Sequence, residues 1–263
     1  MKKISTILVP FDFSESAKKA LEYAVAFVGR NDDIQILLAH ISGLSNFNLL
    51  PENFKKIEEK YSGVLKNKLE WTTQGGASTQ SLLDIQKNRD IDLIIMGTLG
   101  TDEKGDAAQS HTSKLALEAD CPVLVVPLEH KDDDFQIKRI ALVLGQEEID
   151  DTKALGTLLE VARRFNAKVY VLTIENLPGS YGYSKEDEKN ENTMKYYLEN
   201  FYEEHVFIKN KDVVQGILTY ALKCELDLIA VLPRNHTKNS EPSEGHLTEL
   251  LTLHSKVPVL AID

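Results

Sequence analysis

The chain has 263 residues, of which 42% are hydrophobic and 27% charged, and 41 acidic against 30 basic residues give it a formal net charge of −11. This composition is typical of a globular protein that buries one large core or two ordinary ones. The negative charge disfavours nucleic acid and anionic membrane surfaces as partners, and no run of about eighteen apolar residues occurs that would span a bilayer.

The first residues and the two cysteines favour a cytoplasmic protein. The segment MKKISTILVP runs from two lysines directly into a strand-like stretch and contains no signal-peptide cleavage pattern. Cys121 and Cys224 lie far apart, without a C-x-x-C pair or histidines at metal-ligand spacing. We therefore expect cytoplasmic localisation, two reduced thiols and no metal site formed by these cysteines.

Apolar patterning in the first half predicts five strands that alternate with four helices. The strands are expected at residues 4–9, 34–41, 69–73, 93–96 and 123–126. The helices are expected between the N-cap Ser14 and Gly29, at residues 53–68 and 79–88, and after Ser110. The runs LIIM (93–96) and VLVV (123–126) show no in/out alternation, which is typical of parallel strands covered by helices on both faces.

The second half repeats this plan. ILLAHI (36–41) aligns with VYVLTI (169–174) at an offset of 133, DLIIMG (92–97) with DLIAVL (227–232) at 135, and CPVLVV (121–126) with VPVLAI (257–262) at 136. Five strands are expected at residues 137–144, 168–174, 202–208, 226–232 and 257–262, and four helices at 151–165, 187–199, 211–223 and 246–254. We therefore predict an α/β protein with two tandem doubly wound five-stranded parallel-sheet domains, at residues 1–129 and 135–263.

The stretch that follows the strand at 93–96 has the features of a ligand loop. Gly97 and Gly100 permit close backbone approach, because they carry no Cβ. Ser110 stands where a helix should begin, so its hydroxyl can cap that helix while free N–H groups face an anion. In open α/β sheets, ligands bind at the carboxyl ends of the strands, where this loop starts.

Gly97, Gly100, Ser110, Thr112 and the ending CPVLVVP (121–127) occur in an order that resembles the universal stress protein signature, G-x-x-G, nine residues, then G-[S/T], a helix and a P-V-L-V strand. Two features depart from it. The spacer at 101–108 is one residue short, and Gln109 stands in place of the second-cluster glycine. The resemblance implies a tandem two-domain member with the adenine nucleotide alpha hydrolase-like, Rossmann-like fold, in which part of the ATP motif of the first domain is degenerate.

The resemblance also implies a ligand and its contacts in the first copy. The ligand would be ATP or a related adenine nucleotide, with magnesium, and the alternative is that the site takes none. In members that bind ATP, adenine meets an acid after the first strand and a backbone position at the end of the second. The implied cofactor-binding residues are Asp12, Ile41, Gly97, Gly100, Ser110 and Thr112.

Two observations on the residues themselves weigh against tight binding. Asp12 and Ser14 stand before a helix, where capping alone explains them. Asp102, Glu103 and Asp106 put negative charge beside the phosphates, which a magnesium ion would invert.

The second copy has lost more of the motif. At the repeat offsets, Asp12 aligns with Gly145, Gly97 with Leu232 and Gly100 with Asn235, and Gly245 and Thr248 alone match the helix start. Arg234, His236 and Lys238 make its loop more basic, for which a solvated loop is favoured over an anion site. We therefore expect the second domain to be degenerate.

The sequence has no G-x-S-x-G elbow, no Walker lysine loop and no H-E-x-x-H motif. The resemblance implies a stress-response sensor that binds a small ligand, and the lack of these motifs predicts that it has no efficient catalysis, no catalytic residues and no metal site. The alternative is a ligand-free interaction scaffold with both sites decayed, and a slow nucleotide hydrolase comes third. Strands 123–126 and 257–260 resemble the dimer strand of single-copy members, which implies an intramolecular pseudo-dimer and leaves a homodimer and the identity of a protein partner open.

Overall fold

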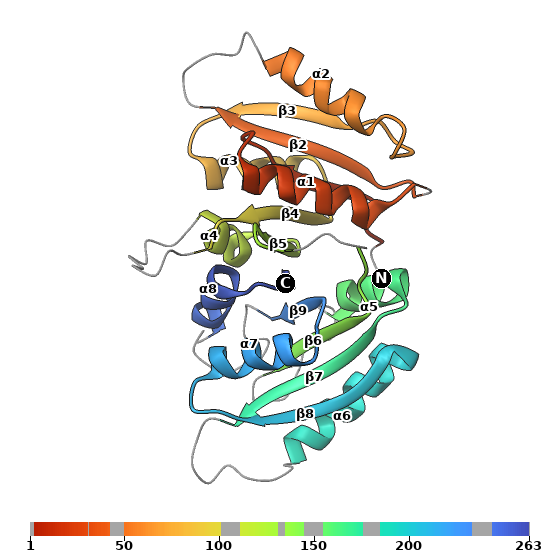
Figure 1. Ribbon diagram of the computed structural model, residues 1–263, viewed down its shortest axis with the longest axis vertical. Helices are drawn as coiled ribbons and strands as arrows, with labels where there is room; N and C mark the ends of the chain where they lie inside the picture. Colours follow the sequence, from red (N-terminus) through yellow and green to blue (C-terminus); the bar gives the residue numbers. More distant parts are fainter. Residues whose placement is uncertain are drawn as a thin grey trace. The chain divides into compact units, whose positions relative to one another are not determined.

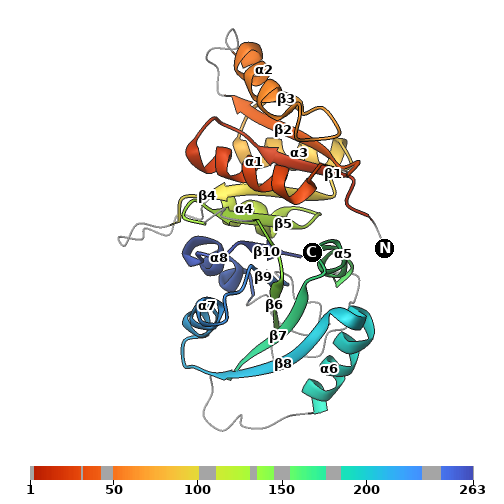
Figure 2. The same cartoon turned by 45° about the vertical axis from the view of Figure 1, so that its right-hand side comes forward.

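The computed structural model divides the chain into two compact units, Lys3–Phe135 and a second unit that begins at Gln136. It describes residues 3–30, 32–42, 50–100, 111–130, 135–144, 155–175, 185–232 and 244–262. Figures 1 and 2 show both units from two directions. The predicted fold class, two tandem α/β units with parallel sheets, is confirmed.

The first unit is a parallel sheet in the order β3-β2-β1-β4-β5. Its strands are β1 (Thr6–Pro10), β2 (Gln35–Ser42), β3 (Glu70–Gly75), β4 (Leu93–Thr98) and β5 (Val123–Pro127), and its helices are α1 (Glu15–Val28), α2 (Leu50–Tyr61), α3 (Ser78–Asn88) and α4 (His111–Glu118). The chain moves outward from β1 to β3 and then returns past β1 to β4 and β5. Right-handed crossovers therefore place α1 and α2 on one face and α3 and α4 on the other, as Figure 1 shows for α1 and α3.

The second unit repeats this order as β8-β7-β6-β9-β10. Its strands are β6 (Arg139–Leu144), β7 (Lys168–Glu175), β8 (Tyr202–Lys209), β9 (Leu228–Val231) and β10 (Val259–Ala261), and its helices are α5 (Leu155–Phe165), α6 (Lys185–Leu198), α7 (Val213–Lys223) and α8 (Glu244–His254). A short 3-10 turn, Glu199–Phe201, connects α6 to β8. Figure 2 shows α7 and α8 on one side of this sheet and α5 and α6 on the other.

The central strands have the burial that their apolar runs predict. Leu93, Ile94 and Ile95 in β4 are each 0% exposed, because helices cover both faces of the sheet. Both cysteines are free thiols, with Cys121 buried and Cys224 half-buried. No helix in the described ranges is long and apolar enough to cross a membrane.

The predicted end of the second helix was wrong. Residues 53–68 were expected to be helical, whereas α2 begins at Leu50 and ends at Tyr61. The backbone N–H groups of Val64 and Leu65 both donate to the carbonyl oxygen of Tyr61, at 2.9 and 3.2 Å, and so form a turn. Gly63 lies within that turn, and glycine is a poor helix former, which explains the early termination.

An aspartate at the amino end of β4 and its counterpart at β9 tie each sheet together. Asp92 Oδ2 accepts hydrogen bonds from the Ser5 amide (2.9 Å), the Ser5 hydroxyl (2.6 Å) and the Thr6 amide (3.0 Å). Asp227 Oδ2 accepts from the amides of Lys138 (2.7 Å) and Arg139 (2.9 Å). The repeated sequence DLI therefore marks a repeated structural link at the edge opposite the ligand loop.

Candidate functional site

The candidate site lies at the carboxyl edge of the first sheet, where the strand order reverses between β1 and β4. These two strands pair with Ile7 opposite Leu93, and β1 also pairs with β2 so that Pro10 lies opposite Ala39. Asp12 follows β1 by two residues, Ile41 and Gly97 are the penultimate residues of β2 and β4, and Gly100 follows β4 by two residues. These positions therefore lie at the carboxyl ends of neighbouring strands around the topological switch point, the usual place for a ligand in such sheets.

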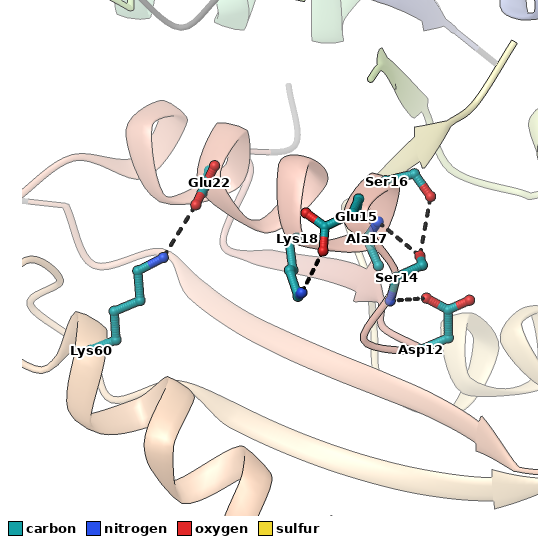
Figure 3. A network of polar contacts seen from close by, with 8 residues as sticks. All are labelled: Asp12, Ser14, Glu15, Ser16, Ala17, Lys18, Glu22 and Lys60. Carbon is teal, nitrogen blue, oxygen red and sulfur yellow. Dashed lines mark hydrogen bonds and ion pairs between the residues drawn. The ribbon is translucent and has the colours of Figure 1, made fainter. Parts of the chain in front are cut away.

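The segment between β1 and α1 is held by its own side chains (Figure 3). Asp12 is exposed, and its Oδ1 accepts a hydrogen bond from the Ser14 amide at 3.0 Å. Ser14 is the N-cap of α1, and its Oγ accepts from the Ala17 amide at 3.2 Å. Ser16 Oγ lies 3.1 Å from Ser14 Oγ. Capping therefore accounts for Ser14 and for one oxygen of Asp12, and the second carboxylate oxygen accepts no hydrogen bond from the described residues.

Gly97 is in direct contact with the start of α1. A Cβ built on Gly97 would lie 2.0 Å from the carbonyl oxygen of Ser16 and 2.5 Å from its carbonyl carbon. Real Cβ atoms do not approach backbone atoms so closely, so only glycine fits there unless α1 moves away from β4. The fold itself therefore requires the glycine at 97, a reason that the spacing of the motif did not reveal.

Gly100 has a different constraint. Its φ of 76° lies in the left-handed region, which glycine adopts without steric cost. Its amide donates to Thr98 Oγ1 at 3.1 Å, and Thr98 is 6% exposed. The backbone therefore turns sharply as it leaves β4.

An aromatic cluster that sequence reasoning missed lies beside Asp12. Phe13 has φ of 67°, rare for a side chain of this size, and its ring centroid is 5.1 Å from Phe54 and 5.5 Å from His40. Because a carbonyl oxygen only accepts, the Nδ1–H of His40 donates to the Phe11 carbonyl at 2.8 Å. Phe54 stacks on Trp71 with centroids 4.7 Å apart and planes inclined by 6°. These contacts explain His40 as part of the packing at the strand ends.

The start of α4 contains the remaining residues of the candidate site that the structure describes. Thr112 is 8% exposed, in the first turn of α4. His111, the first residue of α4, places Nδ1 3.1 Å from Ser78 Oγ and 3.2 Å from Thr79 Oγ1, so it connects the starts of α3 and α4. Ser110 lies outside the described residues, as do Asp102, Glu103, Lys104, Asp106 and Gln109.

Lysines on helices of the first unit are paired with carboxylates, among them Lys55 with Glu59 (4.0 Å) and Lys87 with Asp120 (3.4 Å). Three further pairs involve lysines of α1, α2 and α4. The pairs are Lys18 with Glu15 (2.6 Å), Lys60 with Glu22 (3.2 Å) and Lys114 with Glu118 (3.9 Å), and Figure 3 shows the first two along α1. All six side chains are at least 46% exposed, so these pairs contribute little to stability. None of the three lysines is held close to Asp12 by these contacts.

The carboxyl edge of the second sheet differs from that of the first. Leu232 follows β9 directly, whereas its counterpart Gly97 is the penultimate residue of β4, and Thr248 in α8 is 1% exposed. His246, near the start of α8, has its Nδ1 3.9 Å from Glu249 Oε2. Arg234, Asn235, His236, Lys238 and Gly145 lie outside the described residues.

Comparison with known proteins identifies the family. The model of the Universal stress protein family matches residues 3–127 and again residues 136–263. Comparison with curated proteins gave no match.

Solved structures share the fold over the whole chain. A universal stress protein from Archaeoglobus fulgidus DSM 4304 is 17% identical, with a TM-score of 0.67 over 99% of this chain and 98% of that one. A universal stress protein from Pseudomonas aeruginosa UCBPP-PA14 is 13% identical, with a TM-score of 0.63 over 98% and 92%. The cytoplasmic domain of a prokaryotic cation chloride cotransporter is 9% identical, with a TM-score of 0.57 over 99% and 95%. At these identities the likeness concerns the fold alone.

Proposed function

Because the chain belongs to the universal stress protein family, in which its two halves are tandem domains, we propose that it is a stress-response sensor that binds an adenine nucleotide in its first domain without turning it over. The single observation that supports this most is the convergence of Asp12, Ile41, Gly97 and Gly100 at the switch point of the first sheet. The proposed site also includes Thr112, in the first turn of α4, and Ser110, which lies outside the described residues.

Two regions of this edge suit different parts of a nucleotide. Asp12 carries a negative charge and has one carboxylate oxygen beyond its bond to Ser14, which suits the uncharged, donor-bearing end of a nucleotide. The described residues of the turn at Gly100 and of the first turn of α4 include no acidic side chain, and the first N–H groups of a helix have no intrahelical acceptor. The phosphates therefore belong at the loop and the helix start, with adenine toward Asp12 and Ile41.

Magnesium would enter with the phosphates of the nucleotide. The described residues contain no group of three His, Cys, Asp or Glu side chains that would hold a metal ion. We therefore propose no ligands for the ion among the described residues. We also propose that the protein is located in the cytoplasm.

We propose binding in the first domain alone. Leu232 stands where the first domain has Gly97, and the imidazole of His246 lies 3.9 Å from the carboxylate of Glu249 in the same helix. One nucleotide per chain is expected by calorimetry. Two equivalent sites would contradict this assignment.

A second candidate is supported by specific contacts. Gly97 is required by its packing against Ser16, and Asp12 organises the turn before α1, so two of the motif residues have structural roles that need no ligand. Both would persist in a ligand-free interaction scaffold. Protein purified without added ligand and then denatured distinguishes the two: a sensor releases an adenine nucleotide, which chromatography identifies, and a scaffold releases none.

A substitution at Asp12 tests the site more directly. In Asp12→Asn the amide oxygen still accepts from Ser14, so the turn is kept, while the free carboxylate oxygen becomes an NH₂ donor. We expect ATP affinity to fall about tenfold or more, since the ligand donor loses a charged acceptor. Asp212→Asn is the matched control, because Asp212 also accepts from a helix amide, that of Gln215 at 3.0 Å, in the second unit. Unchanged ATP affinity in Asp12→Asn would remove Asp12 from the site.

A further inference from the structure

A hollow in the second unit lies between α7 and the end of α8, two helices that Figure 2 shows on the same side of the sheet. It encloses about 190 Å³, and its lining comes from α7 and from the residues that lead from the end of α8 toward β10. The apolar part of the lining includes Leu218, Ala221 and Leu222, and the polar part includes Thr219, His254 and Lys256.

The internal repeat explains why this space is open. The helices α3 and α7 have 11 residues each, and the offset of 135 that aligns DLIIMG with DLIAVL also aligns their first and last residues. Ala221 therefore corresponds to Gln86 of the first unit. Gln86 is 7% exposed, so its long side chain fills interior space, whereas Ala221 is 1% exposed and carries only a methyl group. The shorter side chain leaves room in the second unit that the first unit fills.

The charges at this place also differ between the two units. At the positions that line the hollow, the first unit has three acidic side chains and one lysine, and that lysine, Lys87, pairs with Asp120 at 3.4 Å. The lining in the second unit contains one lysine and one histidine and no acid. An anion in the hollow therefore meets no acidic side chain in its lining, although the whole chain has a net charge of −11. The corresponding residues, at offsets of 135 and 136, are Asp84 and Thr219, Lys87 and Leu222, Glu118 and His254, and Asp120 and Lys256.

The polar side chains of the hollow offer hydrogen-bond donors. Thr219 Oγ1 accepts from the side-chain amide of Gln215 at 3.1 Å, which leaves the hydroxyl proton of Thr219 for another acceptor. Lys256 is exposed and carries a positive charge. The hydroxyl of Ser255 is used within the chain, because it donates to the Val257 carbonyl at 2.6 Å and accepts from the Val257 amide at 3.0 Å. A carboxylate, which only accepts hydrogen bonds, matches the two remaining donors.

We propose that the second unit binds a small aliphatic carboxylate in this hollow. The carboxylate lies toward Lys256 and Thr219, and the aliphatic chain covers Leu218 and Leu222, of which Leu222 is 61% exposed without a ligand. The volume of about 190 Å³ equals the share of about six water molecules in the liquid, which suits a chain of about four to six carbons. This site is separate from the nucleotide site proposed in the first domain and does not depend on it.

The test compares hexanoate with hexanamide, an uncharged analogue of similar shape, by titration of the full-length protein followed by NMR chemical shifts. Wild-type protein is expected to bind hexanoate about fivefold more tightly, the effect of one ion pair at a partly exposed site. Lys256→Gln should remove this preference and leave the affinity for hexanamide within about twofold. Lys223→Gln is the matched control, because Lys223 is exposed at the end of α7 and does not line the hollow.

Two further variants test where the carboxylate binds. Ala221→Gln, which introduces the residue of the first unit, should fill the hollow and weaken the binding of both compounds by about tenfold or more. Leu222 is 61% exposed, so Leu222→Glu keeps the fold and should weaken hexanoate binding by a similar factor, because its charge repels the carboxylate.

The outcomes decide the proposal. A preference for hexanoate that is lost in Lys256→Gln and kept in Lys223→Gln supports it. The proposal is overturned if hexanoate does not bind wild-type protein, if hexanoate and hexanamide bind equally, or if Leu222→Glu binds hexanoate as wild-type protein does.

Discussion

Gly97 and Ser16 lie so close that a single added carbon on Gly97 would be 2.0 Å from the Ser16 carbonyl oxygen. We expect Gly97→Ala to destabilise the first unit by roughly 2 kcal/mol or more, because α1 must shift and its packing against β4 is lost. Urea denaturation measures this change.

Gly75→Ala provides the control for Gly97→Ala. Gly75 also lies at the end of a strand, and nothing is within 4 Å of a Cβ built on it. A Gly97→Ala protein as stable as wild type would mean that α1 and β4 are not packed as described. A loss of ligand binding in any Gly97 variant must accordingly be interpreted together with its stability.

Asp92 and Asp227 allow a comparison of the two units. Asp92→Ala leaves three donors without their acceptor at an 8% exposed position, and we expect a loss of about 3 kcal/mol. Asp227→Ala leaves two donors at a half-buried position and should cost less. Denaturant unfolding of the two variants checks the order, and an equal or reversed order would contradict it.

The acidic loop residues affect the phosphate end of the proposed site. Asp102, Glu103 and Asp106 lie outside the described residues, so their effect stays a prediction. If they repel the phosphates, D102N/E103Q/D106N should tighten nucleotide binding at low magnesium by at most about tenfold, and less as salt rises. If they hold magnesium, the same variant binds more weakly when the ion is present.

The acidic linker offers the matched control for that experiment. D132N/D133N/D134N removes the same number of negative charges from residues that follow β5. Titrations of both variants with and without magnesium distinguish a local effect from one of net charge. Equal changes in the two variants would exclude a specific role for the loop.

Tyr220 predicts a change at alkaline pH. Burial raises the pKa of Tyr220, and its hydrogen bond to Cys224 raises it further. The folded state thus binds the proton more tightly than the unfolded state, whose pKa is about 10. The contribution to stability is full below about pH 10 and is lost as the pH rises toward the folded pKa. As the pH rises above about 10, wild-type protein should lose stability faster than Tyr220→Phe. In the variant, phenolate absorbance should show one tyrosine fewer that titrates only at the highest pH values.

Much of the fold could be predicted because the sequence signals act locally. Continuous apolar runs indicated the buried strands, and Ser14 caps α1 as expected, with Gly29 ending it at φ 68°. The end of α2 was missed, because the periodic apolar pattern continues to Leu65 beyond the turn that contains Gly63. At this point the low helix propensity of Gly63 and the apolar periodicity gave different predictions, and the helix ended as the propensity predicts.

The site was predictable only in part, because its decisive contacts join segments distant in sequence. The resemblance named Asp12, Ile41, Gly97 and Gly100, and the sheet order explains why they converge. The contact of His111 with Ser78 and Thr79 depends on how α3 and α4 pack. The spacing of residues in the sequence does not predict such a contact.

The packing of α1 against Gly97 affects how signatures of this kind should be used to infer function. A glycine required for folding is kept by purifying selection whether or not a nucleotide is ever bound, because its replacement destabilises the fold. Lineages that abandon the ligand would keep this glycine long after positions such as 109 have drifted. Among homologues, a charge that the fold does not require, such as that of the Asp12 carboxylate, whose single bond to Ser14 an amide oxygen could also accept, is therefore the better record of whether the ligand has been retained.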